Sequence, residues 1–516
     1  MRDAVAALLV ALAVMAAPSA LAQNLEESRK YCDDDTGAYS LDLQIGGCTA
    51  LIRSGTEATQ DLAYIFNNRG VSYNAQKNYD AAIADYTQAI KLKPDYGQAW
   101  TNRGNAYHRQ ENYAKALPDH DEAVRLEPKN KEFLRNRGLT YFEQRDFAKA
   151  LADFDRSIAI DPRYGDAIFN RGALYLEQKD YARAIADFTT GIGIEPRDPD
   201  FYFKRGLAFR GQGEDTKAVA DYGEAIRLDP DYGSAYYNRA IVHYALEDYA
   251  KAVADYRETV RIDPKDDEAW RGLGNAYDDN GQIELAMNAY GEALKINPQS
   301  PLAYFDRGLS YGRQGEDARA IADYSEALKI DPAYSPALSN RGQLYGRQGE
   351  NVKAMADLDQ AIRLRPDYGN SHAYRGDVFY NQKDYASAVA SYDKALSLAE
   401  PRADWLNERC WIRAVWGQQL DKAIADCGEA LKIAPDDPSI FDTRGMVNFK
   451  LGKFAEALAD YEAALKGNDK AMGSLYGRGT TKLRLGQAEA GNADIARAKA
   501  GDPKVADRYA GYGVKP

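Results

Sequence analysis

The chain has 516 residues, 45% of them hydrophobic, and its 66 basic and 78 acidic residues give a formal net charge of −12. Charges of both signs are interspersed and no basic run occurs, which excludes a protein that holds nucleic acid or an anionic membrane surface by electrostatics. Beyond the N-terminal segment, no stretch is long and apolar enough to suggest a membrane span.

The first 22 residues have the features of a secretory signal. Arg2 precedes an apolar run from Ala4 to Ala17, and Ala20-Leu21-Ala22 is a small-x-small cleavage sequence. We therefore predict a signal peptide over residues 1–22, cleaved after Ala22, and a mature protein that is periplasmic or secreted. The alternative is a frayed N-terminal helix.

Four cysteines form two local pairs, Cys32 with Cys48 and Cys410 with Cys427. An even number of cysteines in nearby pairs, in an exported protein, predicts two disulfides. The alternative is four buried free thiols. The spacing C-x-x-C, typical of metal and redox sites, does not occur.

Residues 23–62 are predicted to form an N-terminal cap, a degenerate half of the unit that follows. From residue 63 to residue 505 the sequence repeats every 34 residues, with one step of 35. Such a period predicts stacked supersecondary units, which we call repeats. Their most regular mark is a small residue, here numbered position 8: Gly70, Gly104, Gly138, Gly172, Gly206, Ala240, Gly274, Gly308, Gly342, Gly376, Cys410, Gly445 and Gly479.

Each repeat is predicted to contain two helices. Position 20 is alanine from Ala82 to Ala457, and apolar residues recur around it at helical spacing. Asn or Asp residues such as Asn78 stand where they can cap the second helix. Proline at position 32, from Pro94 to Pro503, ends that helix in eleven of thirteen repeats.

The small residues at positions 8 and 20, the aromatic position 11 (Tyr107, Tyr277) and the proline resemble the tetratricopeptide repeat. This resemblance implies an all-α fold, a right-handed superhelical solenoid of about thirteen helix–turn–helix repeats with a cap at each end. Residues 506–516 would form the C-terminal cap and tail, with a short helix over about Lys504–Ala510. The architecture implies protein binding but names no partner.

Position 7 is usually apolar in this family, but here it is arginine in twelve of thirteen repeats, and position 23 is aspartate in eleven. The repeat with Leu273 in place of the arginine also has Ala289 in place of the aspartate. We predict that the two side chains pair within each repeat, with Arg375 facing Ser391 as an exception. The alternative is an anion-binding row of arginines.

Catalysis finds little support in the sequence. The four histidines fall at different positions of the repeats in which they occur, and Ser, His and Asp show no spacing typical of a triad. Phosphate-binding glycine loops are also missing, because Gly211-Gln212-Gly213 reads as a turn between helices. We therefore expect no enzyme, no metal and no cofactor.

In the family the first helices line a concave groove. Here aromatic side chains at position 5 stand beside carboxylates at position 2, which predicts a groove for protein or peptide segments carrying apolar residues and Lys or Arg. The candidates are Phe169, Phe203, Tyr237, Phe305, Leu207, Ile241, Tyr244, Glu132, Asp166, Asp200 and Glu268.

Two alternatives to this groove stay open. The rings at position 5 can instead pack between repeats, and aromatics beside carboxylates also suit a glycan or cell-wall polymer. The sequence favours a non-enzymatic scaffold outside the cytoplasm, with envelope assembly or secretion as a setting suggested by resemblance.

Overall fold

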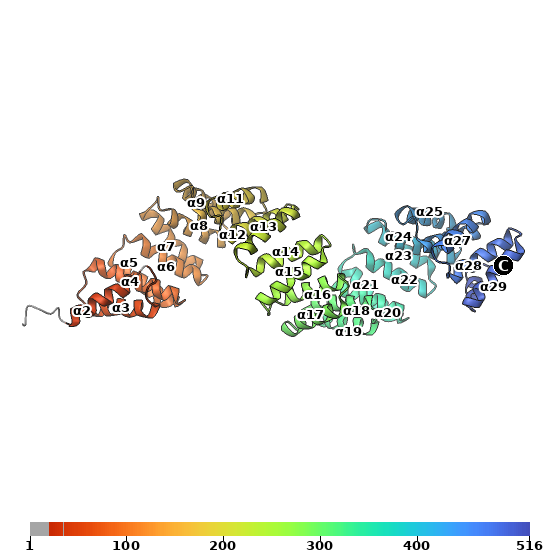
Figure 1. Ribbon diagram of the computed structural model, residues 1–516, viewed down its shortest axis with the longest axis horizontal. Helices are drawn as coiled ribbons and strands as arrows, with labels where there is room; N and C mark the ends of the chain where they lie inside the picture. Colours follow the sequence, from red (N-terminus) through yellow and green to blue (C-terminus); the bar gives the residue numbers. More distant parts are fainter. Residues whose placement is uncertain (1–19, 35) are drawn as a thin grey trace, which may run out of the picture. The chain divides into compact units, whose positions relative to one another are not determined.

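The computed structural model describes residues 20–34 and 36–516, and every regular element in these residues is an α-helix (Figure 1). The apolar run of the predicted signal peptide, Ala4–Ala17, lies outside the described residues. Within them, none of the helices has the length and hydrophobicity that a membrane-spanning segment needs.

The chain divides into two compact units, Met1–Asp263 and Pro264–Pro516. The first unit holds a cap of two helices and then six helix pairs. Its helices are α2 (Ala20–Cys32), α3 (Leu41–Ser54), α4 (Thr59–Ala75), α5 (Tyr79–Leu92), α6 (Gly97–Arg109), α7 (Tyr113–Leu126), α8 (Lys131–Glu143), α9 (Phe147–Ile160), α10 (Gly165–Glu177), α11 (Tyr181–Ile194), α12 (Pro199–Gly211), α13 (Asp215–Leu228), α14 (Gly233–Ala245) and α15 (Tyr249–Ile262).

The second unit holds seven helix pairs and a short last helix, so the described residues contain the thirteen repeats expected from the sequence. Its helices are α16 (Asp267–Asp279), α17 (Ile283–Ile296), α18 (Pro301–Arg313), α19 (Asp317–Ile330), α20 (Ser335–Arg347), α21 (Asn351–Leu364), α22 (Gly369–Asn381), α23 (Tyr385–Leu398), α24 (Ala403–Trp416), α25 (Leu420–Ile433), α26 (Pro438–Lys450), α27 (Phe454–Gly467), α28 (Met472–Arg484), α29 (Ala488–Gly501) and α30 (Val505–Gly511).

The turn between the two helices is built as predicted in the repeats that carry Asn or Asp at the cap. The Asn78 side chain accepts a hydrogen bond from the Ala81 N–H at 3.3 Å, which caps α5. The residue before the cap is left-handed, whether it is Lys77 at a φ of 62° or Gly213 at 78°. The Gly211–Gly213 run is therefore a turn between helices, as predicted.

The core of most repeats is a ring at position 24 laid across the small residue at position 8. A Cβ atom added to Gly138 would come within 2.7 Å of the Phe154 ring, so only glycine allows this approach. In the second repeat the ring belongs to His120, which is fully buried, and burial lowers its pKa to about 3. His120 is thus a neutral core side chain.

Within each unit, the first helices of most successive repeats contact one another. Among the described residues, second helices of successive repeats make no comparable contact. The stack therefore curves toward its first helices, and we call the surface over them the inner face.

Candidate functional site

An arginine at position 7 of the first helix and an aspartate at position 23 of the second form a buried ion pair. Arg341 donates from Nε and Nη2 to the two oxygens of Asp357 at 2.7 and 2.9 Å, a bidentate geometry. These hydrogen bonds raise the pKa of Arg341. The equivalent pairs are Arg69–Asp85, Arg103–Asp119, Arg137–Asp153, Arg171–Asp187, Arg205–Asp221, Arg239–Asp255, Arg307–Asp323, Arg409–Asp426, Arg444–Asp460 and Arg478–Asp494.

These pairs confirm the predicted ladder, and its two exceptions behave as expected. Leu273 and Ala289 replace both partners and are each 2% exposed, so two buried apolar side chains stand where the ion pair would be. Arg375, opposite Ser391, reaches Asp359 at 3.4 Å instead and leaves its Nε buried without a hydrogen bond.

The arginines also join neighbouring repeats, which the sequence analysis missed. Arg341 Nη1 donates to Ser325 Oγ at 3.0 Å, and Arg171 Nη1 donates to Asp155 at 2.7 Å. Both acceptors lie at position 25 of the preceding repeat. The signal was present in the sequence, because that position is often Thr, Ser or Asp. The bidentate bonds to aspartate hold these guanidinium groups in structural contacts, which argues against an anion-binding row.

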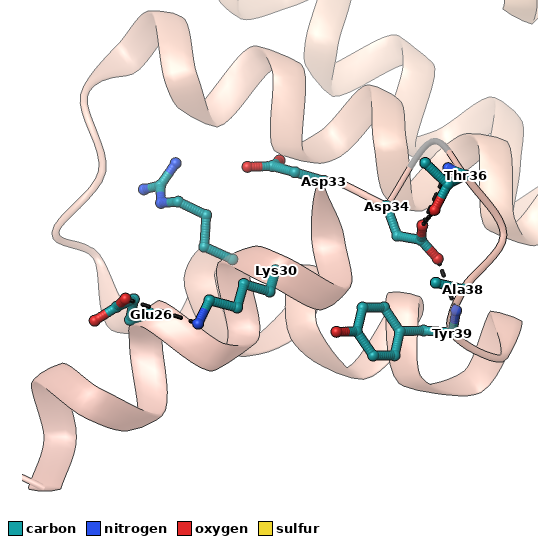
Figure 2. A pocket seen from close by; sticks show the side chains of 8 residues that line it. Glu26, Lys30, Asp33, Asp34, Thr36, Ala38 and Tyr39 are labelled. Atoms are coloured by element: carbon teal, nitrogen blue, oxygen red, sulfur yellow. Dashed lines mark hydrogen bonds and ion pairs between the residues drawn. The ribbon is translucent and has the colours of Figure 1, made fainter.

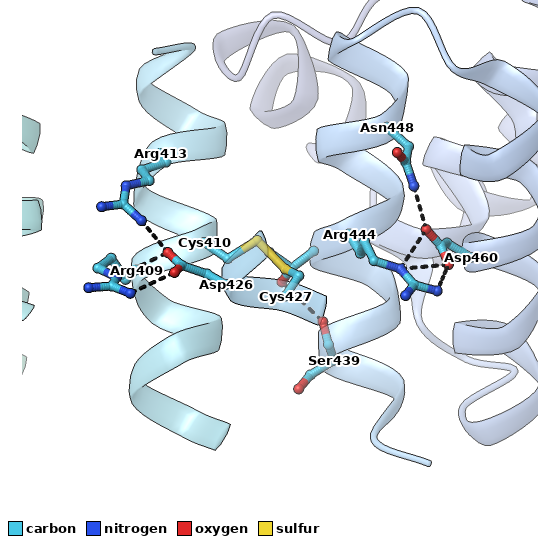
Figure 3. The surroundings of a disulfide bond; sticks show 10 residues. Arg409, Cys410, Arg413, Asp426, Cys427, Ser439, Arg444, Asn448 and Asp460 are labelled. Carbon is cyan, nitrogen blue, oxygen red and sulfur yellow. Dashed lines mark hydrogen bonds and ion pairs between the residues drawn. A yellow bond between two sulfur atoms is a disulfide. The ribbon is translucent and has the colours of Figure 1, made fainter. Parts of the chain in front are cut away.

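Both predicted disulfides are present. Cys32 joins Cys48 across α2 and α3, and Cys410 joins Cys427 across α24 and α25. Figure 3 shows that the second bond lies beside the ion pair of Arg409 with Asp426. Since Cys410 and Cys427 hold positions 8 and 24, the disulfide takes the place of the ring on glycine seen in other repeats.

Two of the position-5 rings lie partly or wholly in the core of the first unit. Phe203 is 8% exposed, with its ring 5.9 Å from Tyr222 and 5.1 Å from Tyr232. Phe169 is half-buried, 5.8 Å from Phe188 and 5.3 Å from Phe201. For Phe203 the arrangement corresponds to packing between repeats.

The other two rings, like Phe169, are less buried than Phe203. Tyr237 is half-buried at 5.8 Å from Tyr256 in the first unit. In the second unit Phe305 is half-buried between Tyr324 and Tyr334, with ring centroids 5.7 and 5.1 Å away.

The remaining groove candidates surround these rings within their units. Leu207, Ile241 and Tyr244 are half-buried on α12 and α14, whereas all four carboxylates are exposed. Asp200 accepts a hydrogen bond from the Tyr232 hydroxyl at 2.5 Å, and Asp166 accepts one from Arg135 of the preceding repeat. Glu132 on α8 and Glu268 on α16 complete the set.

A second group of carboxylates, on successive first helices α22 and α24, was not singled out from the sequence. Burial raises the pKa of Asp377 to about 6, although the Tyr392 hydroxyl donates a hydrogen bond to it. Burial, with the charges of Asp377 and Asp404 nearby, raises the pKa of Glu408 to about 7. Glu408 is nevertheless exposed to solvent, so neighbouring side chains crowd its carboxyl without enclosing it.

The N-terminal cap contains an open recess of about 590 Å³ between α2 and the loop that leads to α3 (Figure 2). Asp34 organises this loop, because its carboxylate accepts the N–H and hydroxyl of Thr36 and the N–H of Tyr39 at 2.7 to 3.1 Å. These hydrogen bonds lower the pKa of Asp34. The acidic loop is therefore a structural turn. In the described part of the chain, no cluster of His, Cys, Asp and Glu could hold a metal ion.

Several solved structures are similar to this chain. One is the APC/C hetero-tetramer Cut9–Hcn1, which is 12% identical over 88% of this chain and 95% of that chain, with a TM-score of 0.47. A tetratricopeptide repeat protein from Parabacteroides merdae is 20% identical over 52% of this chain and 100% of that chain, with a TM-score of 0.41. Yeast Tom70 is 14% identical over 74% and 92% of the two chains, with a TM-score of 0.38.

A search of curated proteins gave no match. Family models described as "TPR repeat" match residues 70–111, 274–315 and 313–349. Models described as "Tetratricopeptide repeat" match residues 97–130, 138–208, 203–267, 339–405 and 443–506. The matched segments together cover more than half of the sequence and lie in both units. The chain belongs to the tetratricopeptide repeat family.

Proposed function

We propose that the chain is a non-enzymatic scaffold outside the cytoplasm, and that its inner face binds protein or peptide segments. The fold is one typical of protein–protein interaction. The observation that carries the proposal is the inner face of α8 to α14, where half-buried rings at position 5 lie among exposed carboxylates.

The chemistry of these side chains favours a segment that is apolar and basic. The half-buried rings of Phe169 and Tyr237 offer apolar surface with few rotamers to freeze, as hot spots at interfaces do. Exposed carboxylates such as Glu132 attract Lys and Arg and would mainly speed association.

The location outside the cytoplasm rests on two features. Residues 1–22 have the features of a signal peptide, and the two disulfides are of a kind that persists in oxidising compartments. Intact mass of the exported protein tests this location. A chain starting at Gln23 supports it, whereas the full-length mass in the envelope fraction contradicts it.

The binding proposal is tested by selecting peptides from a displayed library on the intact protein, beside a glycan array. We expect enriched peptides with aromatic or aliphatic residues near Lys or Arg, and a silent glycan array. The reverse result would replace the peptide scaffold by glycan binding.

A charge reversal locates the site. Glu132→Lys on α8 should slow association of the selected peptides and reduce its salt dependence, because it reverses a rim charge. The matched control is Glu284→Lys, the same change at an exposed carboxylate on a second helix, α17. Equal effects of the two variants would contradict binding on the inner face.

A further inference from the structure

The segment Val505–Lys515 lies along the inner face of the last three repeats of the second unit, and we call it the docked segment. Its helix α30 contacts α28 and α29. Tyr512 packs edge-on against Trp411 of α24 at 5.2 Å, two first helices further back. A cap that merely continued the stack would contact the last repeat alone.

The rest of the docked segment crosses the two intervening first helices. Arg484 of α28 donates to the Lys515 carbonyl at 3.3 Å. Lys450 of α26 lies beside Gly513, since a Cβ atom there would stand 3.6 Å from Lys450 Nζ. The inner face over α24, α26 and α28 therefore already holds a peptide segment.

Three apolar anchors fix the segment. Val505, Tyr509 and Val514 are 0%, 3% and 0% exposed. The Tyr509 ring lies 5.3 Å from Tyr476, and a Cβ atom at Gly473 would come within 2.7 Å of its hydroxyl. Gly473 thus opens a fitted pocket for a tyrosine.

The backbone turn after α30 brings the third anchor inward. The Val514 N–H donates to the Tyr509 carbonyl at 2.9 Å, and the Gly513 N–H to the Ala510 carbonyl at 3.0 Å. With Gly513 at a φ of +81°, this is a Schellman motif, in which the residue after glycine contacts the last helical turn. A short helix ended by glycine is the conformation that the surface accepts.

The segment and the surface beneath it carry charges of both signs. The segment holds Arg508 and Lys515 but also Asp507, and Arg508 pairs with Asp502 at 2.8 Å. The surface includes Asp442, which accepts a hydrogen bond from Ser474 at 2.6 Å, and also the cations Lys450 and Arg484. The aromatic and apolar anchors, rather than net charge, therefore carry the recognition.

We propose that the inner face over α24, α26 and α28 is a binding site for a segment of a partner protein with two aromatic residues three positions apart, followed by glycine and a small apolar residue. The docked segment fills this site in cis until the partner segment displaces it. The inference rests on the proposed scaffold function and adds a second site with its own partner chemistry. Because a short linker tethers the docked segment, it competes with a free peptide at an effective concentration of roughly millimolar. Removing the segment should therefore measurably strengthen binding of that peptide.

The test uses the full chain with a protease site inserted between Gly501 and Asp502, and a fluorescent peptide of residues 502–516. After cleavage and removal of the released segment, the peptide should bind at least about tenfold more tightly than to uncut protein, by anisotropy. A peptide with Tyr509→Ala should bind at least about tenfold more weakly than the unaltered peptide. Equal binding to cut and uncut protein, or no binding to cut protein that keeps its helical circular dichroism, would overturn the proposal.

A second variant covers the case in which cleavage unfolds the last repeat. Tyr512→Ala in the uncut chain removes the contact with Trp411 and leaves Val505 and Tyr509 in place. We expect faster hydrogen exchange over residues 509–514 and tighter binding of the peptide. Unchanged exchange and binding would overturn the proposal. So would a dimer of the uncut chain that disappears on cleavage, because the segment would then occupy a second copy and not its own chain. None of these results bears on Glu132→Lys in the other unit, so this proposal can fail while the scaffold function stands.

Discussion

Replacing Arg341 by leucine is the sharpest test of how the repeats are held together. The substitution leaves the carboxylate of Asp357, whose side chain is 11% exposed, without its bidentate partner. Removing one partner of a fully buried pair costs about 3–5 kcal/mol; because the Arg341 side chain is 20% exposed, we expect about 2–3 kcal/mol. Adding Asp357→Ala should recover about 1–2 kcal/mol of that loss.

The natural precedent for the double variant is the repeat with Leu273 and Ala289. Solenoids can open repeat by repeat, so local free energies are read from native-state hydrogen exchange of the α20 and α21 amides. Arg375→Leu is the matched control, because Arg375 has no aspartate at position 23 and should cost less than Arg341→Leu. Strictly additive losses in the double variant would refute the pairing.

Three further predictions follow from single sites. Alkylation of the unreduced, denatured protein should label no cysteine, and labelling of Cys410 or Cys427 would contradict their disulfide. Reducing this disulfide, whose closed loop is short, should lower the free energy of unfolding by about 3 kcal/mol. His120 is neutral in the fold with a pKa of about 3 but titrates near 6.5 when unfolded, so stability should fall as pH falls from about 6.5 toward 3. In His120→Phe the melting temperature should fall less as the pH falls. An unchanged dependence of the melting temperature on pH would contradict the role of His120. Phe203→Ala should cost about 3–5 kcal/mol, and a variant with an unaltered melting temperature would show that the ring is not core.

Most of the fold could be predicted because the residues that determine the structure of each repeat lie close together in the sequence. Asn78 caps a helix and Gly138 admits a ring, and the same choices recur through the chain. The pairing of arginine with aspartate was also predictable, since Leu273 and Ala289 depart together. The hydrogen bond from the arginine to the preceding repeat was missed, because its acceptor position 25 is Thr, Ser or Asp in some repeats and Gly, Arg, Glu or Ala in others.

The candidate site was harder to predict than the fold. Phe203 and Tyr237 hold the same position, but one is 8% exposed and the other half-buried, since Tyr222 and Tyr232 both enclose Phe203. The raised pKa of Glu408 depends on how neighbouring repeats crowd it, which no local pattern shows.

The docked segment shows the same limit. The sequence predicted a short helix covering the last repeat, and α30 is there. The contact of Tyr512 with Trp411 depends on how the last three repeats stack, so it could not be found from spacing along the chain.

The measurement that tests the central claim most directly is site-specific photocrosslinking in the native envelope. A photoreactive phenylalanine at Tyr237 keeps an aromatic ring on the inner face, and the same residue at Val352, which is 87% exposed on α21, samples a second helix. We expect peptide adducts at Tyr237, lost when unlabelled selected peptide is added, and few at Val352. Adducts at Val352 with none at Tyr237 would contradict binding on the inner face.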